Sequence, residues 1–379
     1  GEAAAAGNVR CAEVCLGALA NICTHKEVVA RLPDADVAAL VGAALDGLGA
    51  AEGVVVLQAL RLACSLMMGP AFRSCAALWD DAAVARCLYV LENSLLWEVV
   101  QRAADTLSQA LVLDCSTAGD EVPRATSPDG KGVVRLMASE GLVAVLTQRL
   151  GELASAVAVE VEPSADAGEG DPETALLSAL CLADSFLAAL AESSGSDSGA
   201  PRPALADDIS PLATACLRVL AFVGRPEVVA AALELLSSLF DWESATDRAP
   251  PEGLLASASI SDATTIAPQV RACLGGTLGL GIIEKLAFFL QDKAGGEEDQ
   301  EQEEDSVVVT ALWLLDLAPW QSVAEHREGL VPIVGSLLQA AGRPGSSGPG
   351  IEVLSPTFLR RLGVGPPAPG ACAAASALE

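Results

Sequence analysis

Apolar residues recur along the chain at steps of three and four residues, in stretches separated by short turns. Such stretches predict amphipathic helices. In the first part of the chain they cover residues 9–23, 34–48, 53–68, 70–80, 81–93 and 95–114. Later they cover residues 175–192, 213–225, 226–242, 278–293, 307–320 and 329–340. Runs with the two-residue alternation of β-strands are scarce, so the pattern predicts an all-α chain.

The helical pattern also repeats. A 41-residue offset places Val14 over Val55 and Leu96, and it aligns further apolar columns along the same three helices. A period of this length is typical of armadillo and HEAT repeats, whose units are roughly 40 to 47 residues long. We therefore predict an armadillo/HEAT-like α-solenoid with disordered acidic insertions.

Segments rich in Gly, Pro, Ser and acidic residues interrupt the helices, and they lack the apolar residues needed to order a chain. We predict armadillo-like repeats over residues 1–150 and 175–340, joined by an acidic linker over 151–174. The remaining segments are predicted to be disordered: insertions at 193–208, 243–270 and 293–306, and a tail over 341–379.

Charge and hydropathy limit the classes of partner that are compatible with the chain. The 379 residues include 50 acidic and 22 basic ones, for a formal net charge of −28. A field of this sign repels nucleic acid phosphates and favours basic protein partners, so we expect no nucleic-acid partner. Charged residues such as Arg61, Asp184 and Asp316 interrupt the most apolar stretches, so we also expect no membrane span.

The cysteines raise the question of a metal site. The stretch "CAEVCLGALANICTH" (11–25) contains three of the 11 cysteines and one of the two histidines. Cys11 and Cys15 share one helical face, Cys23 lies on an adjacent stripe, and no CxxC pair occurs, which disfavours zinc. Free thiols packed in helices within a reducing compartment explain these residues better. We predict no metal and no other cofactor.

Catalytic motifs are equally unsupported. The stretch "GSDSGAP" (195–201) superficially resembles a serine-protease nucleophile loop but lies in a low-complexity segment. The stretch "GGTLGLG" (275–281) lacks the Lys-Ser/Thr of a phosphate-binding loop. The acidic run 297–305 lacks the spacing of a calcium loop. We predict no catalytic residues and no enzymatic activity.

Two arginines are candidates for partner binding. In the 41-residue register Arg61 and Arg102 occupy the same position, with Gln58 and Gln101 nearby. On stacked helices they would lie on one face, about 10 Å apart, where they could bind carboxylates of a partner. The alternative is that both are ordinary solubilising surface charges.

Three stretches, 15–32 ("CLGALANICTHKEVVARL"), 54–67 and 87–114, resemble the serum amyloid A-like protein family of armadillo-type helical proteins. The resemblance implies an intracellular, non-enzymatic protein of the cytoplasm or nucleus, linked to cell proliferation. "GALAN" (17–21) is similar to the third helix of an armadillo repeat, in which Asn bonds to an extended peptide, and this implies a partner-binding role for Asn21. At the 41-residue offset the next units have Leu62 and Ala103, so the Asn is not repeated.

From these patterns we expect a non-catalytic helical-repeat scaffold or adaptor that binds other proteins. Two alternatives stay open. One is a nuclear-transport adaptor or chaperone for basic cargo, and the other is a constitutive structural subunit of a large assembly.

Overall fold

The computed structural model describes residues 2–67, 81–116, 133–159, 171–195, 206–247, 266–294, 304–341 and 354–364. Within these ranges the chain forms helices α1 to α17 and no strand, which confirms the predicted all-α class. Contacts divide the chain into two compact units, residues 1–204 and residues 205–379.

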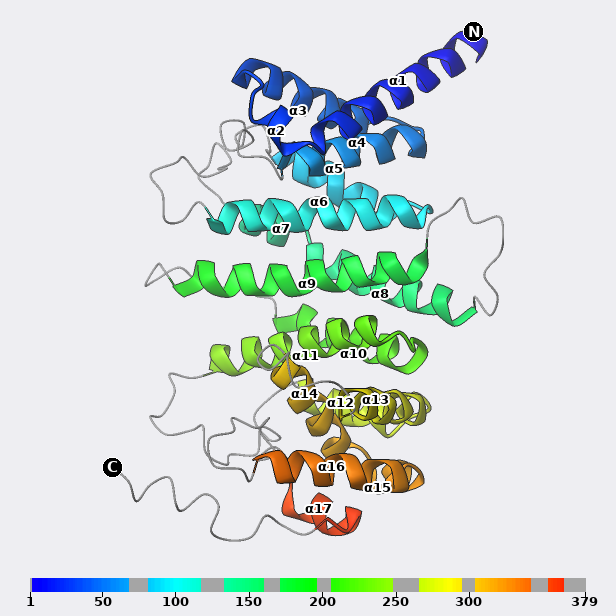
Figure 1. The fold of residues 1–379 in the computed structure, drawn as a ribbon, viewed down its shortest axis with the longest axis vertical. Coiled ribbons are helices and arrows are strands. Elements are labelled where there is room, and N and C mark those ends of the chain that lie inside the picture. The colour runs from blue at the N-terminus through cyan, green and yellow to red at the C-terminus, as the bar shows by residue number, and fades with distance from the viewer. Residues whose placement is uncertain are drawn as a thin grey trace. The chain divides into compact units, whose positions relative to one another are not determined.

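Unit 1 contains α1 to α9 (Figure 1). Their bounds are α1 Glu2–Cys23, α2 Lys26–Val29, α3 Asp34–Leu48, α4 Gly53–Met67, α5 Asp81–Asn93, α6 Trp97–Ser116, α7 Val133–Ser139, α8 Leu142–Val159 and α9 Pro172–Gly195. Four of them pack in sequence, α1 on α4, α4 on α6 and α6 on α9. A second series, α3, α5 and α8, packs in the same way and contacts the first.

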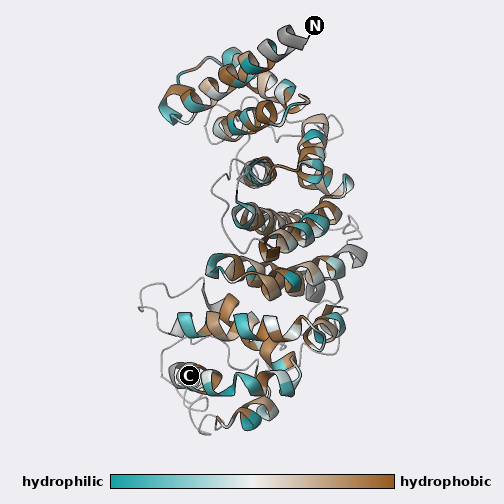
Figure 2. Ribbon diagram, turned by 90° about the vertical axis from the view of Figure 1, so that its right-hand side faces the viewer, coloured by the Kyte–Doolittle hydropathy of each residue, from teal (hydrophilic) through white to brown (hydrophobic). Residues whose placement is uncertain are grey.

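Helix boundaries in unit 1 follow local chemistry. Pro33 precedes α3, and Asp34 and Asp36 lie in its first turn, where carboxylates favour the positive end of the helix dipole. Gly49 ends the helix. Figure 2 shows that hydrophobic and hydrophilic residues both occur along each helix, as burial on one side and solvent on the other require.

The buried residues of α4, α6 and α9 follow one pattern of eight positions. The first position is Val55, Val99 or Ala175, and the other seven follow it at +1, +4, +5, +7, +8, +11 and +12 in the sequence. Every residue at these positions in the three helices is buried. The third position is always alanine: Ala59, Ala103 and Ala179. A Cβ added to Gly47 of α3 would lie 2.8 Å from the Ala59 methyl group, so the small side chain allows helices to approach closely.

This pattern replaces the predicted 41-residue register. Val55 and Val99, the first positions in α4 and α6, define a 44-residue register instead. In that register α1 also has apolar residues at all eight positions, from Cys11 to Cys23. The two offsets differ by three residues, nearly one helical turn, so an apolar face aligns with an apolar face in either register.

Unit 2 contains α10 to α17. Their bounds are α10 Ala206–Phe222, α11 Pro226–Asp247, α12 Ile266–Leu274, α13 Gly279–Ala294, α14 Glu304–Leu317, α15 Trp320–Glu325, α16 Arg327–Ala341 and α17 Pro356–Leu362. Helix α13 packs between α10 and α16, and α11 packs on α14. The eight-position pattern recurs from Val228 in α11 and, for seven positions, from Val307 in α14, with Ala232 and Ala311 as the third position.

Several predicted boundaries are corrected. Helix α8 extends to Val159 and α11 to Asp247, into the predicted linker and the insertion at 243–270. The predicted disordered tail contains α17, whose Phe358 and Leu362 are buried. This helix begins at Ser355, whose hydroxyl accepts a hydrogen bond from the backbone N–H of Phe358. Residues 160–170 of the acidic linker, and the "GSDSGAP" stretch after Gly195, lie outside the described residues.

The expectation of no membrane span is wrong. Two stretches, Leu142–Val159 and Pro172–Ala191, are long and apolar enough to cross a membrane. A bent pair, Pro268–Leu274 with Gly279–Asp292 at 94°, also qualifies. A criterion that excludes every charge is too strict, because a helix of this length can carry one or two charged residues and stay sufficiently apolar. In the structure 44% and 56% of the two straight stretches are buried among other residues.

Candidate protein-binding face

Polar side chains stand beside the buried positions of α1, α4, α6 and α9, and we call them the polar face of unit 1: Asn21, Gln58, Arg61, Gln101, Arg102, Asp105 and Ser178. Its first connection joins α1 to α4. Arg61 donates a hydrogen bond to the Asn21 amide oxygen at 3.0 Å and another to the Gln58 amide oxygen at 2.8 Å. Three of the five predicted partner-binding residues therefore form one cluster, although they come from two helices.

A second connection joins α6 to α9. Arg102 lies 3.6 Å from the Asp105 carboxylate, one turn along α6. Asp105 also accepts a hydrogen bond from Ser178 on α9. Burial raises the pKa of Asp105, while the Ser178 hydroxyl and the Arg102 charge oppose that rise. The carboxylate is thus held partly out of water between two helices.

Cys64 lies within electrostatic range of the α6 cluster. It is half-buried on α4, and burial is the main cause that raises its pKa. The charge of Asp105 raises the pKa further and that of Arg102 lowers it, so both α6 side chains lie close to this α4 residue. The polar face thus has residues on four helices, from Asn21 on α1 to Ser178 on α9.

The two arginines do not occupy equivalent positions, which corrects the 41-residue register. In the 44-residue register Arg102 corresponds to Gln58, and Arg61 corresponds to Asp105. Gln101 lies next to Arg102 and is partly exposed. One position of the repeat thus holds an arginine in α4 and an aspartate in α6, and the face presents charges of both signs.

Arg102 has an unused donor. Its Nε is buried and, within the described part of the chain, has no hydrogen-bond partner. The side chain as a whole is 37% exposed. A buried donor without a partner is unfavourable, whereas the part of the guanidinium that reaches solvent can donate to a carboxylate or carbonyl of a bound partner.

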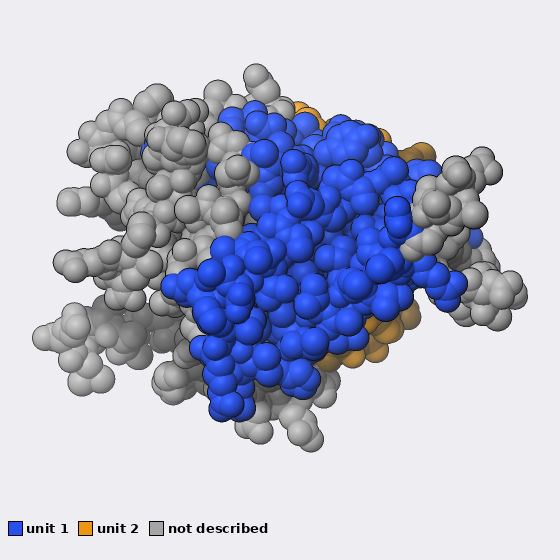
Figure 3. Space-filling model, turned by 90° about the horizontal axis from the view of Figure 1, so that it is seen from above, with its two compact units in different colours: residues 1–204 blue, residues 205–379 orange. Residues whose placement is uncertain are grey.

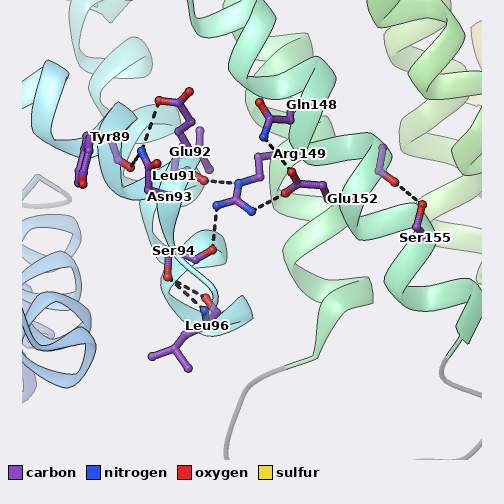
Figure 4. A network of polar contacts seen from close by, with 11 residues as sticks. Tyr89, Leu91, Glu92, Asn93, Ser94, Leu96, Gln148, Arg149, Glu152 and Ser155 are labelled. Carbon is purple, nitrogen blue, oxygen red and sulfur yellow. Dashed lines mark hydrogen bonds and ion pairs between the residues drawn. The ribbon is translucent and has the colours of Figure 1, made fainter.

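One buried arginine of unit 1 was not among the predicted residues. Arg149 of α8 is 4% exposed and donates to the carbonyl oxygens of Leu91 at 2.6 Å and Ser94 at 2.8 Å (Figure 4). Its remaining nitrogen pairs with Glu152 at 2.6 Å. These carbonyls end α5, so the cation also faces the negative end of a helix dipole. Its apolar neighbours Leu146 and Leu153, one turn away on either side, were the available signal.

The cysteines of the opening stretch do not converge. Cys11 and Cys15 are exposed on α1, whereas Cys23 is buried. His25 precedes α2 and is exposed. Among the described residues no group of three or more His, Cys, Asp or Glu could hold a metal ion. The stretch 275–281 makes the turn from α12 into α13, where Gly279 lies against the Leu274 carbonyl.

Comparison with known proteins gives no family for this chain. No family model matches the sequence, and no curated protein matches it. The resemblance to the serum amyloid A-like family therefore stays a prediction, and the functional argument depends on the residues of the chain itself.

Proposed function

We propose that the chain is a non-catalytic scaffold or adaptor, with an armadillo-like repeat arrangement, that binds another protein along its polar face. The observation that supports this most is that polar side chains connect α1 to α4, through Arg61 and Asn21, and α6 to α9, through Asp105 and Ser178. Helices α4, α6 and α9 each bury an apolar face beside these polar residues. Repeat proteins use such stacked surfaces to bind extended partners.

The chemistry of the face suits a partner with carboxylates and free backbone groups. Arg61 and Arg102 provide guanidinium donors, and Gln58, Gln101 and Asn21 provide amides that both donate and accept. The exposed part of the Arg102 guanidinium can donate to a carboxylate of the partner. Because Asp105 lies beside Arg102, the partner also needs a donor at that point.

The test is affinity purification of the tagged full chain with quantitative mass spectrometry. We expect Arg61→Glu combined with Arg102→Glu to lose a subset of the captured proteins. The matched control is Arg31→Glu combined with Arg135→Glu, which makes the same charge change at two exposed arginines outside the polar face. An identical set of captured proteins for both double variants and the unchanged chain would refute a role for the face.

The family resemblance supports a location for this scaffold in the cytoplasm or nucleus. The 11 cysteines are consistent with it, because those described are free. Imaging of the fluorescently tagged full chain tests this part of the proposal, which a secreted or exclusively organellar protein would contradict.

The net charge of −28 favours a second candidate, an adaptor or chaperone for basic cargo. Such binding depends on long-range attraction and is screened by salt. We expect the affinity of this class of partner to fall steeply between low and physiological ionic strength. A complex insensitive to salt would refute this second candidate.

A further inference from the structure

The serine that begins α17 connects this short helix to α14. The Ser355 hydroxyl donates a hydrogen bond to the Asp316 carboxylate at 2.7 Å and accepts one from the Phe358 N–H at 3.1 Å. Ser355 is partly exposed, and Pro356 and Thr357 after it are exposed. Helix α17 belongs to unit 2, which is drawn in orange in Figure 3. A hydroxyl that solvent reaches thus makes one of the contacts that hold α17 in place.

Ser355 also stands before a proline. Ser-Pro is the dipeptide that proline-directed serine/threonine protein kinases recognise, and the chain has it at Ser127, Ser210 and Ser355. These kinases bind the serine in an extended backbone. Ser210 lies inside α10 with a buried hydroxyl, and Ser127 lies outside the described residues. Ser355 has an extended backbone, with φ −63° and ψ 144°, so within the described chain it is the Ser-Pro serine that suits a kinase.

A phosphate on Ser355 is incompatible with the contact to Asp316. Phosphorylation replaces the hydroxyl hydrogen, so the oxygen can no longer donate to the carboxylate. It also adds a charge of about −1.5 to −2 at neutral pH, which the Asp316 carboxylate repels. The link between α17 and α14 therefore becomes a repulsion.

Helix α17 itself offers the phosphate another partner. The Arg360 Nε donates to the Pro356 carbonyl oxygen at 3.1 Å, so the guanidinium lies over the residue next to Ser355. Guanidinium groups bind phosphate through charge-assisted hydrogen bonds. Phosphorylation thus exchanges a contact between two helices for one within α17.

The other contacts of α17 do not replace this link. Arg327 Nε donates to the Leu362 carbonyl oxygen at 3.0 Å, and the Trp320 ring meets the Phe358 ring edge-on with centroids 6.4 Å apart. Because α17 has only seven residues, it depends on such docking contacts for its stability. We propose that Ser355 is a phosphorylation site, and that its modification by a proline-directed protein kinase releases α17 from the rest of unit 2.

The co-substrate is ATP. The Ser355 Oγ attacks the γ-phosphorus and forms the new O–P bond, while the bond from that phosphorus to the ADP oxygen breaks and ADP leaves with the electron pair. The hydroxyl proton passes to a carboxylate of the kinase. Release of α17 then exposes Phe358, Leu359 and Leu362, which are buried in the docked state.

The test treats the full chain with a proline-directed kinase and Mg-ATP, followed by phosphopeptide mapping and limited proteolysis. We expect phosphate on Ser355 and none on Ser210. Cleavage within residues 354–364 should become about tenfold faster than in the untreated chain, the scale of one hydrogen bond to a charged group. Ser355→Ala should remove the phosphopeptide, and Thr357→Ala should retain it.

Asp316→Asn is the matched variant that separates repulsion from other effects of the phosphate. It keeps an oxygen that accepts from the unmodified Ser355, and the amide that it introduces can donate to a phosphate. Phosphorylation of this variant should therefore leave its cleavage rate nearly unchanged. The proposal is overturned by the absence of phosphate on Ser355, by phosphorylation without faster cleavage, or by equal acceleration in Asp316→Asn.

Discussion

The Arg149 Nε of α8 lies 2.6 Å from the Leu91 carbonyl oxygen in the last turn of α5. A buried cation thus ties two helices of unit 1 together through backbone atoms that α5 leaves unpaired at its end. This contact does not depend on the side chain at position 91, and only a long donor at position 149 can make it.

Arg149→Ala is expected to destabilise the protein by about 3 kcal/mol, because it leaves the carbonyls of Leu91 and Ser94 buried without a donor. Chemical denaturation followed by circular dichroism measures the loss. Arg135→Ala, at an exposed arginine of α7, is the control and should change stability by less than about 0.5 kcal/mol. Equal effects of the two substitutions would contradict the role given to Arg149.

Asp105→Asn tests the burial of the polar face. The pKa of Asp105 is raised in the folded state, so the folded protein holds this proton more tightly than the unfolded chain does. Stability from this group is fully present at pH below the unfolded pKa and is lost as pH rises through the raised one. The variant should therefore gain stability relative to the unchanged chain as pH rises across the acid range. Denaturation curves across that range measure this, and a difference independent of pH argues against it.

Gly279→Ala should destabilise unit 2, because a Cβ there would overlap the Leu274 carbonyl in the turn between α12 and α13. Overpacking of this kind costs about 1–3 kcal/mol. Gly335→Ala in α16 is the contrasting change, since nothing lies within 4 Å of its Cβ. It should stabilise the helix by about 0.5–1 kcal/mol. Thermal unfolding compares the two, and the same sign for both would refute the steric argument.

Ser355→Ala should release α17. Its hydroxyl donates to Asp316 at 2.7 Å and accepts from the Phe358 N–H at 3.1 Å, so the substitution removes a helix cap and a link to α14. Loss of an N-cap costs about 1 kcal/mol. Limited proteolysis should cleave near residues 354–364 faster in the variant. Ser336→Ala, which removes an exposed hydroxyl bond within α16, serves as the control.

The fold class followed from the sequence because three- and four-residue apolar steps are a local property of each helix. The register did not follow, since the 41-residue and 44-residue offsets differ by nearly one turn and align apolar faces equally well over three helices. The positions of the buried residues decide between the two registers. The pattern with alanine at its third position recurs in α9 and α11, and α6 matches α4 in that pattern only at the 44-residue offset.

The candidate site was predictable only where local periodicity along one helix places the residues. Arg61, Gln58 and Asn21 were found because each is a polar residue beside an apolar stripe, and their contacts follow from helix packing. Asp105 and Ser178 were missed, because α7 and α8 separate α6 from α9 in the sequence and local periodicity does not say which helices meet. Helix α17 was missed because a short capped helix has little periodicity.

The alanine at the third buried position explains a feature of composition. Ala59, Ala103, Ala179, Ala232 and Ala311 place a single methyl group where a helix packs against its neighbours. Helices separated by methyl groups approach more closely than helices separated by leucines. The abundance of alanine is then more than a preference for helix formation. At one residue in each of these helices it limits how far the neighbouring helix lies from it, and a larger side chain there would push that neighbour away.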